Sequence, residues 1–215
     1  MAPLGRIPEA TVARLPLYLR GLDAFPVGVT ATVSSDELAD LAGVNAAKVR
    51  KDLSHLGTYG TRGVGYDATF LRFQISQALG VANVWPVVVC GMGNLGRALA
   101  NHTGFTDRGF PVVAATDSDP GKIGTIVDGV PVHAPGELGD IVRRLDVAIG
   151  VISTPAEAAQ GTADALVAAG VTSIMSFTPT VLSAPDEVEI RSVDLATELQ
   201  ILGFHLHRDR IAGDP

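Results

Sequence analysis

The chain has 215 residues, of which 47% are hydrophobic and 18% charged, and its formal net charge is −7. This composition excludes a disordered polypeptide, and the lack of any uncharged apolar run of about 18 residues excludes a membrane-spanning helix. Residues 1–80 hold eight basic and seven acidic residues, net +1, whereas residues 81–215 hold eight and sixteen, net −8. We expect a globular, cytoplasmic protein without membrane contact, in which nucleic acid contacts only the first part.

Residues 8–24 show the apolar spacing of a helix. The side chains expected in its core are Val12, Leu15, Leu19 and Leu22. Pro16 lacks a backbone N–H and clashes with the preceding turn, so we expect it to kink or divide this helix.

Residues 34–57 carry the signals of two helices joined by a tight turn. Ser34 and Glu37 have the spacing of a capping box, in which each side chain bonds a backbone N–H that the first helical turn leaves free. Gly43 suits the left-handed residue that ends a first helix, and Asn45 can cap a second helix that runs to about Leu56.

The second of these helices is amphipathic. Val49, Leu53 and Leu56 recur at helical spacing and form a stripe for the core, whereas the opposite face is polar and basic. That pattern is typical of a recognition helix that reads the major groove of DNA. The alternative is the solvated face of an ordinary surface helix.

Residues 57–66 favour the DNA-binding alternative. Four glycines alternate with Tyr59, Arg62, Val64 and Tyr66, which predicts a short hairpin, or wing, with an arginine at its tip that can enter a minor groove. The candidate DNA-binding residues are Ser35, Asn45, Ala47, Lys48, Arg50, Lys51, Ser54, Tyr59, Arg62 and Gly63.

A further helix is expected over residues 67–80, followed by a linker from Gly80 to Trp85. Beyond it, short apolar runs at residues 86–90, 112–116, 147–153 and 172–177 alternate with helical segments, which predicts an α/β fold with a parallel sheet. Cys90, the chain's only cysteine, lies in the first run, so the chain has no internal disulfide and no paired-cysteine metal site. We expect Cys90 to be buried, and we predict no metal site.

A glycine-rich motif follows the first of these strands and opens a helix. Its residues are Gly91, Met92, Gly93, Asn94, Leu95 and Gly96. The glycines allow a tight turn, close approach of a pyrophosphate and close packing of helix on strand. Asp117, 21 residues beyond Gly96, ends the next strand, where a carboxylate binds the adenine ribose and repels a 2′-phosphate. The motif predicts NAD(H) as the cofactor; the alternative is a glycine turn in a nucleotide-free fold.

The second half of the sheet supplies candidates for the nicotinamide side of this site. Ser153, Thr154, Pro155 and Phe177 follow predicted strands, although all four can equally be structural turn residues. A hydride-transfer enzyme would also need an acid or base here, but all three tyrosines precede residue 67, and His133 is expected to face solvent in a turn. We therefore predict that the chain is not an enzyme.

The chain resembles the redox-sensing transcriptional repressor family Rex over nearly its whole length. The matching stretches are RLPLYLR (14–20), KVRKDLSHLGTYGTRGVGY (48–66), GMGNLGRAL (91–99), DSDPGKIG (117–124) and VDLATELQ (193–200). The resemblance implies a winged-helix DNA-binding domain (1–80), a Rossmann-type NAD(H)-binding domain (85–193) and a C-terminal segment (194–215) whose helix is domain-swapped. It also places Lys122 at the cofactor site.

The resemblance further implies a homodimer that represses respiratory and fermentative genes when NAD⁺ is high and releases operator DNA when NADH binds. The final helix, residues 194 to about 207, has a stripe of Leu195, Leu199, Leu202 and Leu206 suited to a partner surface. The alternative is a helix packed on its own domain. Asp194 matches the family's aspartate near the nicotinamide, and His102 stands where the family often has its tyrosine partner; together they form the candidate redox switch.

Three rival functions are compatible with parts of this pattern. The chain could be an NAD-dependent oxidoreductase with a helical N-terminal appendage, although it lacks an evident catalytic acid. It could be a CoA-binding protein, because CoA-binding domains share this strand, turn and helix, although Asp117 and the wing argue against it. It could also be a DNA-binding dimer that holds NAD(H) as a fixed cofactor.

Overall fold

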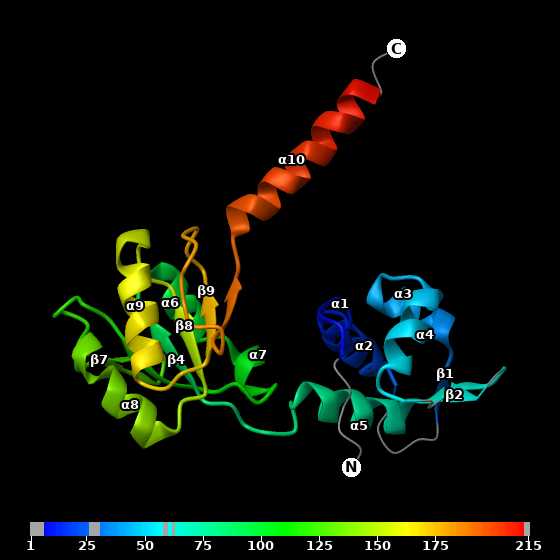
Figure 1. Ribbon diagram of the computed structural model, residues 1–215, viewed down its shortest axis with the longest axis horizontal. Helices are drawn as coiled ribbons and strands as arrows, with labels where there is room; N and C mark the ends of the chain where they lie inside the picture. The colour runs from blue at the N-terminus through cyan, green and yellow to red at the C-terminus, as the bar shows by residue number, and fades with distance from the viewer. Residues whose placement is uncertain (1–6, 26–30, 58–59, 62, 213–215) are drawn as a thin grey trace. The chain divides into compact units, whose positions relative to one another are not determined.

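The computed structural model describes residues 7–25, 31–57, 60–61 and 63–212 (Figure 1). The chain divides into two compact units between Asn83 and Val84, inside the linker expected at Gly80 to Trp85. Each unit has its own buried core. The two units are therefore described separately.

The first unit is a helical bundle with a small sheet. Its helices are α1 (Glu9–Val12), α2 (Leu15–Leu22), α3 (Ser35–Ala42), α4 (Ala46–Ser54) and α5 (Ala68–Leu79). Its strands are β1 (Thr32–Val33), β2 (Gly60–Thr61) and β3 (Gly65–Asp67), arranged in the antiparallel order β1-β3-β2. The β2–β3 hairpin is the predicted wing; Tyr59 and Arg62 lie outside the described residues.

The caps of α3 and α4 are those that the sequence predicts. Ser34 accepts a hydrogen bond from the Glu37 backbone N–H, and the Glu37 carboxylate accepts one from the Ser34 N–H at 2.8 Å. Gly43 ends α3 at a φ of +67°, and the Asn45 side chain accepts the Lys48 N–H at 2.9 Å. These local bonds fix the turn between the two helices.

The first core contains most of the predicted apolar residues, with one correction. The helix is interrupted at residues 13–14, and Pro16 lies in the first turn of α2, which confirms the division of this helix. Val12, however, is 42% exposed, and Thr11 is buried in its place. Because the helix is interrupted, the continuous apolar spacing that placed Val12 inside does not hold across the break.

A buried carboxylate joins α4 to α1 and α2. Asp52 is 1% exposed and accepts four hydrogen bonds, from Thr11 Oγ1, from Arg14 Nε and Nη2, and from Tyr18 Oη. Burial opposes ionisation of Asp52, but the bonds from Arg14, Tyr18 and Thr11 outweigh it and lower the pKa of this carboxyl to about 2. The carboxylate is therefore ionised and fully paired inside the unit.

The second unit is an α/β domain with a seven-stranded sheet. Its strands are β4 (Val87–Cys90), β5 (Val112–Thr116), β6 (Ile126–Val127), β7 (Val130–His133), β8 (Ile149–Ile152), β9 (Ser173–Ser176) and β10 (Glu189–Ser192). Its helices are α6 (Asn94–Ala100), α7 (Thr103–Thr106), the 3₁₀ helix η1 (Pro135–Glu137), α8 (Leu138–Leu145), α9 (Ala156–Ala168) and α10 (Leu195–Ala212). The predicted α/β architecture is confirmed.

The strand order is β10-β9-β8-β4-β5-β7-β6, and all neighbours are parallel except β6 and β7. The order reverses at β4, because β5 lies on one side of it and β8 on the other. Side chains of β4 alternate between a core shared with α8 and α9 and a core shared with α6, so helices cover both faces. Such a reversal opens a crevice at the carboxyl ends of the central strands.

Strands β6, β7 and β10 were not predicted, and His133 was placed wrongly. His133 is the last residue of β7, where it pairs with Thr116, and its Nδ1 lies 3.7 Å from the Glu137 carboxylate. The sequence did not predict this strand because it contains a proline at position 131, and prolines are rare within sheets.

Among the described helices, none is both long and apolar enough to cross a membrane.

The Asp52 carboxylate should make the first unit sensitive to acid. Its folded-state pKa of about 2 lies below the ordinary 3.8, so its stabilisation is complete above about pH 4 and is lost as the pH falls toward 2. The difference corresponds to about 2 kcal/mol of unfolding free energy. Urea unfolding of the full chain, followed by tyrosine absorbance because all three tyrosines lie before residue 67, should show this loss.

Asp52→Asn should remove that part of the pH dependence, whereas Asp36→Asn, a change of an exposed carboxylate in the same unit, should keep it. Equal pH dependence in the Asp52→Asn variant and the unsubstituted protein would contradict the assignment.

Candidate functional site

The glycine turn joins the end of β4 to the start of α6. Gly91 has a φ of +98°, and a Cβ there would lie 2.8 Å from the Ser153 carbonyl oxygen. A Cβ on Gly96 would lie 1.8 Å from the Gly91 carbonyl oxygen, so α6 contacts the turn at a distance that only glycine permits. The N-terminus of α6 consequently opens at the carboxyl edge of the sheet.

A hollow of about 950 Å³ lies at this edge. Nine of the predicted cofactor-binding residues line it: Gly91, Gly93, Asn94, Leu95, Asp117, Lys122, Ser153, Thr154 and Pro155. Its volume is within the range of small-molecule and cofactor sites.

Two features of the hollow fit a dinucleotide. A Cβ on Gly93 would have no atom within 4 Å, so this glycine borders open space into which a pyrophosphate can come close to the backbone. The Thr154 Oγ1 atom is buried and has no hydrogen-bond partner among the described residues. A buried hydroxyl without a partner is costly, and a bound polar ligand can supply one.

Asp117 is held by three donors from the protein. Its Oδ2 accepts the Met92 N–H at 2.7 Å and the Lys122 ammonium at 3.1 Å, and its Oδ1 accepts the Asp119 N–H at 2.8 Å. Burial opposes ionisation, but these bonds hold the pKa of the Asp117 carboxyl below its usual value. Asp117 therefore carries its charge at the hollow and also fixes the glycine turn through Met92.

The remaining candidates on the second half of the sheet have different surroundings. The Ser153 hydroxyl lies 2.8 Å from the Gly91 carbonyl oxygen, which links the end of β8 to the glycine turn. Phe177 packs against the core on the α6 side of the sheet. Met92, Gly96 and Phe177 are not among the residues that line the hollow.

The hollow also has lining residues that the sequence interpretation missed. They are Cys90, Thr116, Ser118, Asp119, Pro135, Leu138, Ala158, Gly161, Thr162 and Ala165. The last four recur at i, i+3, i+4 and i+7 along α9, so their common face was detectable as a stripe of small residues. Pro135 and Leu138 follow β7, a strand that was not predicted, so no sequence pattern placed them at the hollow.

The described lining lacks two side-chain types that commonly transfer protons in enzymes. It contains neither histidine nor tyrosine, and Asp117 and Lys122 are bonded to each other. Burial raises the pKa of the Cys90 thiol to about 11, and Cys90 is 1% exposed as expected. No cluster of three or more metal-ligating side chains exists in the described part of the chain. The volume of the hollow and the glycine turn at its edge suit a nucleotide.

The outer face of α4 is exposed and basic. Val49, Leu53 and Leu56 are buried, as predicted. The exposed candidates on the same helix and its cap are Asn45, Ala47, Lys48, Arg50, Lys51 and Ser54. Within the described ranges, the three basic side chains form no ion pair with a carboxylate, so their charge remains available to an anionic partner.

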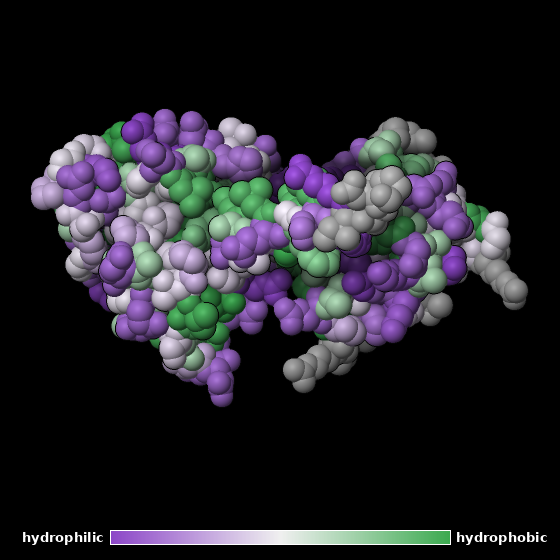
Figure 2. All heavy atoms as spheres, turned by 90° about the horizontal axis from the view of Figure 1, so that it is seen from above, coloured by the Kyte–Doolittle hydropathy of each residue, from purple (hydrophilic) through white to green (hydrophobic). Residues whose placement is uncertain are grey.

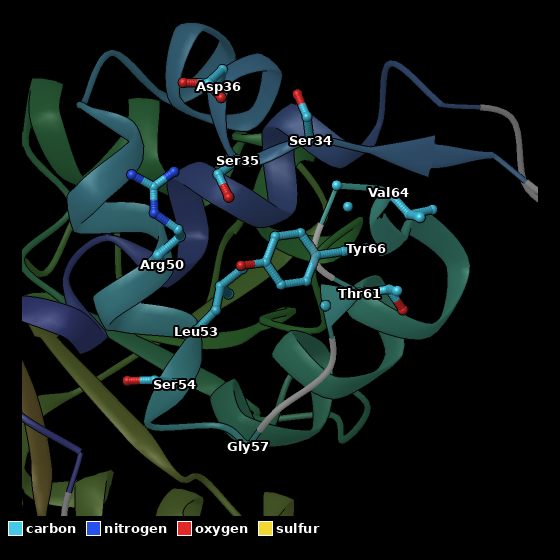
Figure 3. Close-up of a pocket in the computed structure, with 13 residues that line it drawn as sticks. Ser34, Ser35, Asp36, Arg50, Leu53, Ser54, Gly57, Thr61, Val64 and Tyr66 are labelled. Atoms are coloured by element: carbon cyan, nitrogen blue, oxygen red, sulfur yellow. The ribbon is translucent and has the colours of Figure 1, made fainter.

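A second hollow, of about 560 Å³, separates α4 from the wing (Figure 3). Arg50 and Ser54 contribute to it from α4, Ser35 from the start of α3, and Gly63 from the wing. The Tyr66 ring points from β3 toward α4 in this view. A Cβ on Gly60 would lie 2.7 Å from that ring, so the wing strand packs closely on Tyr66.

The two residues of the candidate redox switch are not joined within one chain. Asp194 caps α10: its Oδ1 accepts the Ala196 N–H at 2.9 Å and its Oδ2 accepts the Thr197 hydroxyl. These bonds, chiefly those from Thr197, lower the pKa of the Asp194 carboxyl. His102 is exposed and packs edge-to-face on Phe105 at 4.7 Å. No hydrogen bond or ion pair links His102 to Asp194 in the described chain.

Helix α10 exposes its apolar side chains. The four leucines of the predicted stripe are between 59% and 68% exposed: Leu195, Leu199, Leu202 and Leu206. Ile201 and Phe204 are exposed as well. Figure 2 shows patches of hydrophobic residues on a surface that is otherwise largely hydrophilic or intermediate.

Comparison with known proteins agrees with this division into units. A family model described as a CoA binding domain matches residues 82–180, and one described as a putative DNA-binding protein N-terminus matches residues 6–54. The fold is shared with a crystal structure of RSP in complex with beta-NAD+ and operator DNA (TM-score 0.89, 32% identity, 96% of this chain and 95% of that chain). A complex of RSP with beta-NADH matches with a TM-score of 0.84 and 31% identity, over 96% of this chain and 97% of that one.

Among curated relatives, the redox-sensing transcriptional repressor Rex of Streptomyces coelicolor is 60% identical over 202 residues, which cover 94% of this chain and 78% of the relative. Rex of Carboxydothermus hydrogenoformans is 46% identical over 95% of this chain and 98% of that protein. The predicted family and fold are thus confirmed, and the oxidoreductase alternative is excluded. The chain belongs to the Rex family of redox-sensing transcriptional repressors.

Proposed function

We propose that the chain acts as a homodimer that binds operator DNA when NAD⁺ is abundant and releases it when NADH binds. One observation carries the proposal: a single chain combines an exposed basic helix and wing with a dinucleotide hollow. Its fold is shared over 96% of its length with RSP, which was solved with both beta-NAD+ and operator DNA. In this assignment residues 1–80 bind DNA, residues 85–193 bind NAD(H) and residues 194–215 join the two subunits.

The cofactor would lie across the carboxyl ends of the central strands. The pyrophosphate would approach Gly93 at the N-terminus of α6, where unpaired N–H groups and the helix dipole favour an anion. Asp117 would accept the adenine ribose hydroxyls, and the Thr154 hydroxyl would gain a partner from the other half of the dinucleotide. NAD(H) supplies a nicotinamide ring whose charge changes with its oxidation state.

DNA would be held by the first unit. The outer face of α4 would enter the major groove, with Lys48, Arg50 and Lys51 reaching phosphates and base edges. The wing would contact the adjacent minor groove, where an arginine such as Arg62 is favoured by the negative potential.

The dimer would be formed by α10. Its leucine stripe is exposed in the single chain, and burying such a stripe on a second subunit is strongly favourable, at roughly 25 cal/mol per Å² of apolar surface. Exchange of α10 between subunits would also carry Asp194 to the partner's nicotinamide site.

A sensor must place a charge beside the ring that changes charge, and Asp194 meets this need because it is ionised. The carboxylate would interact differently with the cationic ring of NAD⁺ and with the neutral ring of NADH, so the two arrangements of the dimer would bind the two cofactor forms with different affinities. A differential affinity of about 1–3 kcal/mol is enough to shift a two-state regulator. The two recognition helices would then leave the spacing of about 34–36 Å, or a multiple of it, that successive major grooves require.

Two substitutions should separate the two binding sites. Gly93→Val places a branched side chain where the pyrophosphate would lie, so NADH binding, measured by calorimetry, should fall by more than tenfold while DNA binding without NADH is retained. Lys51→Ala removes an exposed cation, so DNA binding should weaken while NADH affinity is unchanged.

Gly136→Val, at a glycine that also faces open space but does not line the hollow, is the matched control and should leave both affinities intact. Loss of NADH binding in the Lys51→Ala variant would contradict the separation of the sites.

Asp194→Asn should test the charge of the switch while preserving the helix cap, because asparagine caps a helix about as well as aspartate. We expect DNA binding in the presence of NAD⁺ to remain and release by NADH to require a several-fold higher concentration, as measured by mobility shift.

Asp186→Asn changes an exposed carboxylate elsewhere in the same unit and should release DNA normally. Normal release by the Asp194→Asn variant would exclude this role for Asp194.

A further inference from the structure

The buried apolar face of the recognition helix α4 defines the rotation of the helix about its own axis only coarsely. Val49, Leu53 and Leu56 are aliphatic side chains, and apolar burial is non-directional. Cores of this kind accept alternative packings and lose uniqueness before they lose stability. A directional interaction on the inner face can therefore add to the selection of one rotation of α4 about its axis.

Asp52 provides such an interaction at the centre of the inner face. Both of its oxygens accept the Arg14 guanidinium, at 2.6 Å to Nε and 2.7 Å to Nη2, in a two-point geometry that fixes the plane of the carboxylate. Thr11 and Tyr18 occupy the remaining positions at 2.8 Å and 2.6 Å. Thr11, Tyr18 and Asp52 are each 2% exposed or less, so water does not compete for these bonds.

A small rotation of α4 would break this arrangement and would also misplace its outer face. At the radius of a helix with its side chains, about 6 Å, a turn of roughly 20° moves a side-chain end by about 2 Å. Hydrogen bonds to base edges tolerate only about 0.5 Å of variation in length. In the proposed DNA complex, the rotation of α4 would therefore decide whether Lys51 and Ser54 can reach base edges, whereas contacts to phosphates through long flexible side chains are more tolerant.

We infer that the Asp52 cluster, formed by Asp52 with Thr11, Arg14 and Tyr18, positions the recognition helix and thereby determines the sequence specificity of DNA binding. Asp52 and its three partners would act through α4 and would not touch DNA. Because Arg14 neutralises Asp52, the cluster adds no net negative charge beneath the basic outer face. This inference rests on the proposed function of the first unit.

The experiment compares two duplexes at one salt concentration. One is enriched by the unsubstituted protein from a randomised pool, and the other has the same composition in shuffled order. Tyr18→Phe removes one hydroxyl from the cluster, and Thr11→Val with Tyr18→Phe removes two donors while leaving the Arg14 pair. We expect the ratio of the two affinities to fall by about fivefold or more, which is the discrimination that one good base contact supplies.

The salt dependence of binding should remain unchanged in these variants, because the number of phosphate contacts is the same. Ile75→Val is the matched control: it lowers the stability of the same core, at a fully buried position on α5, and removes no hydrogen bond from Asp52. It should retain the affinity ratio. Rescue is tested with Thr11→Ser, which keeps the hydroxyl that donates to Asp52 and should also retain the ratio.

Two results would overturn the inference. An affinity ratio in the Tyr18→Phe variants no lower than that of Ile75→Val would show that the cluster is a stabilising element only. If the unsubstituted protein enriches no sequence from the pool, the proposed DNA-binding function fails, and the inference fails with it.

Discussion

The close contact between α6 and the glycine turn is the constraint on which the cofactor site depends. A side chain at Gly96 would collide with the Gly91 carbonyl oxygen at 1.8 Å, so the start of α6 can reach the turn only without a Cβ. The contact directs the helix N-terminus into the hollow, where it favours a phosphate. Asp117 holds the same turn through the Met92 N–H, so the carboxylate proposed to bind the ribose also fixes the loop proposed to hold the pyrophosphate.

The nucleotide hollow and the helix α4 are held in place by different kinds of interaction. In the second unit, a sheet covered on both faces holds the hollow at the point where the strand order reverses. In the first unit, a nine-residue helix has no such scaffold, and a buried ion pair with two further hydrogen bonds connects it to α1 and α2. Replacing a buried ion pair by apolar residues often costs no stability, so its directionality is the property that distinguishes it.

The elements that were predictable from sequence are those with local causes. The caps at Ser34 and Asn45 and the glycine turn are encoded within a few residues, so spacing alone located them. Strand β7 and the Asp52 cluster depend on partners far along the chain. Asp52 forms hydrogen bonds with residues 34 to 41 positions away, and the sequence of a basic amphipathic helix gives no sign that such an acidic residue is buried. Asp194 and His102 do not meet within one subunit, so neither the sequence pattern nor the single chain brings them together.

The central claim is that the oxidation state of the nucleotide in the hollow controls DNA binding. The most direct test titrates binding of a duplex enriched by the protein while the NADH to NAD⁺ ratio is varied at constant total cofactor concentration. Affinity should be high with NAD⁺ and fall steeply as the fraction of NADH rises, and NADPH should not substitute for NADH because Asp117 repels its 2′-phosphate. Affinity that is independent of the ratio would contradict the account.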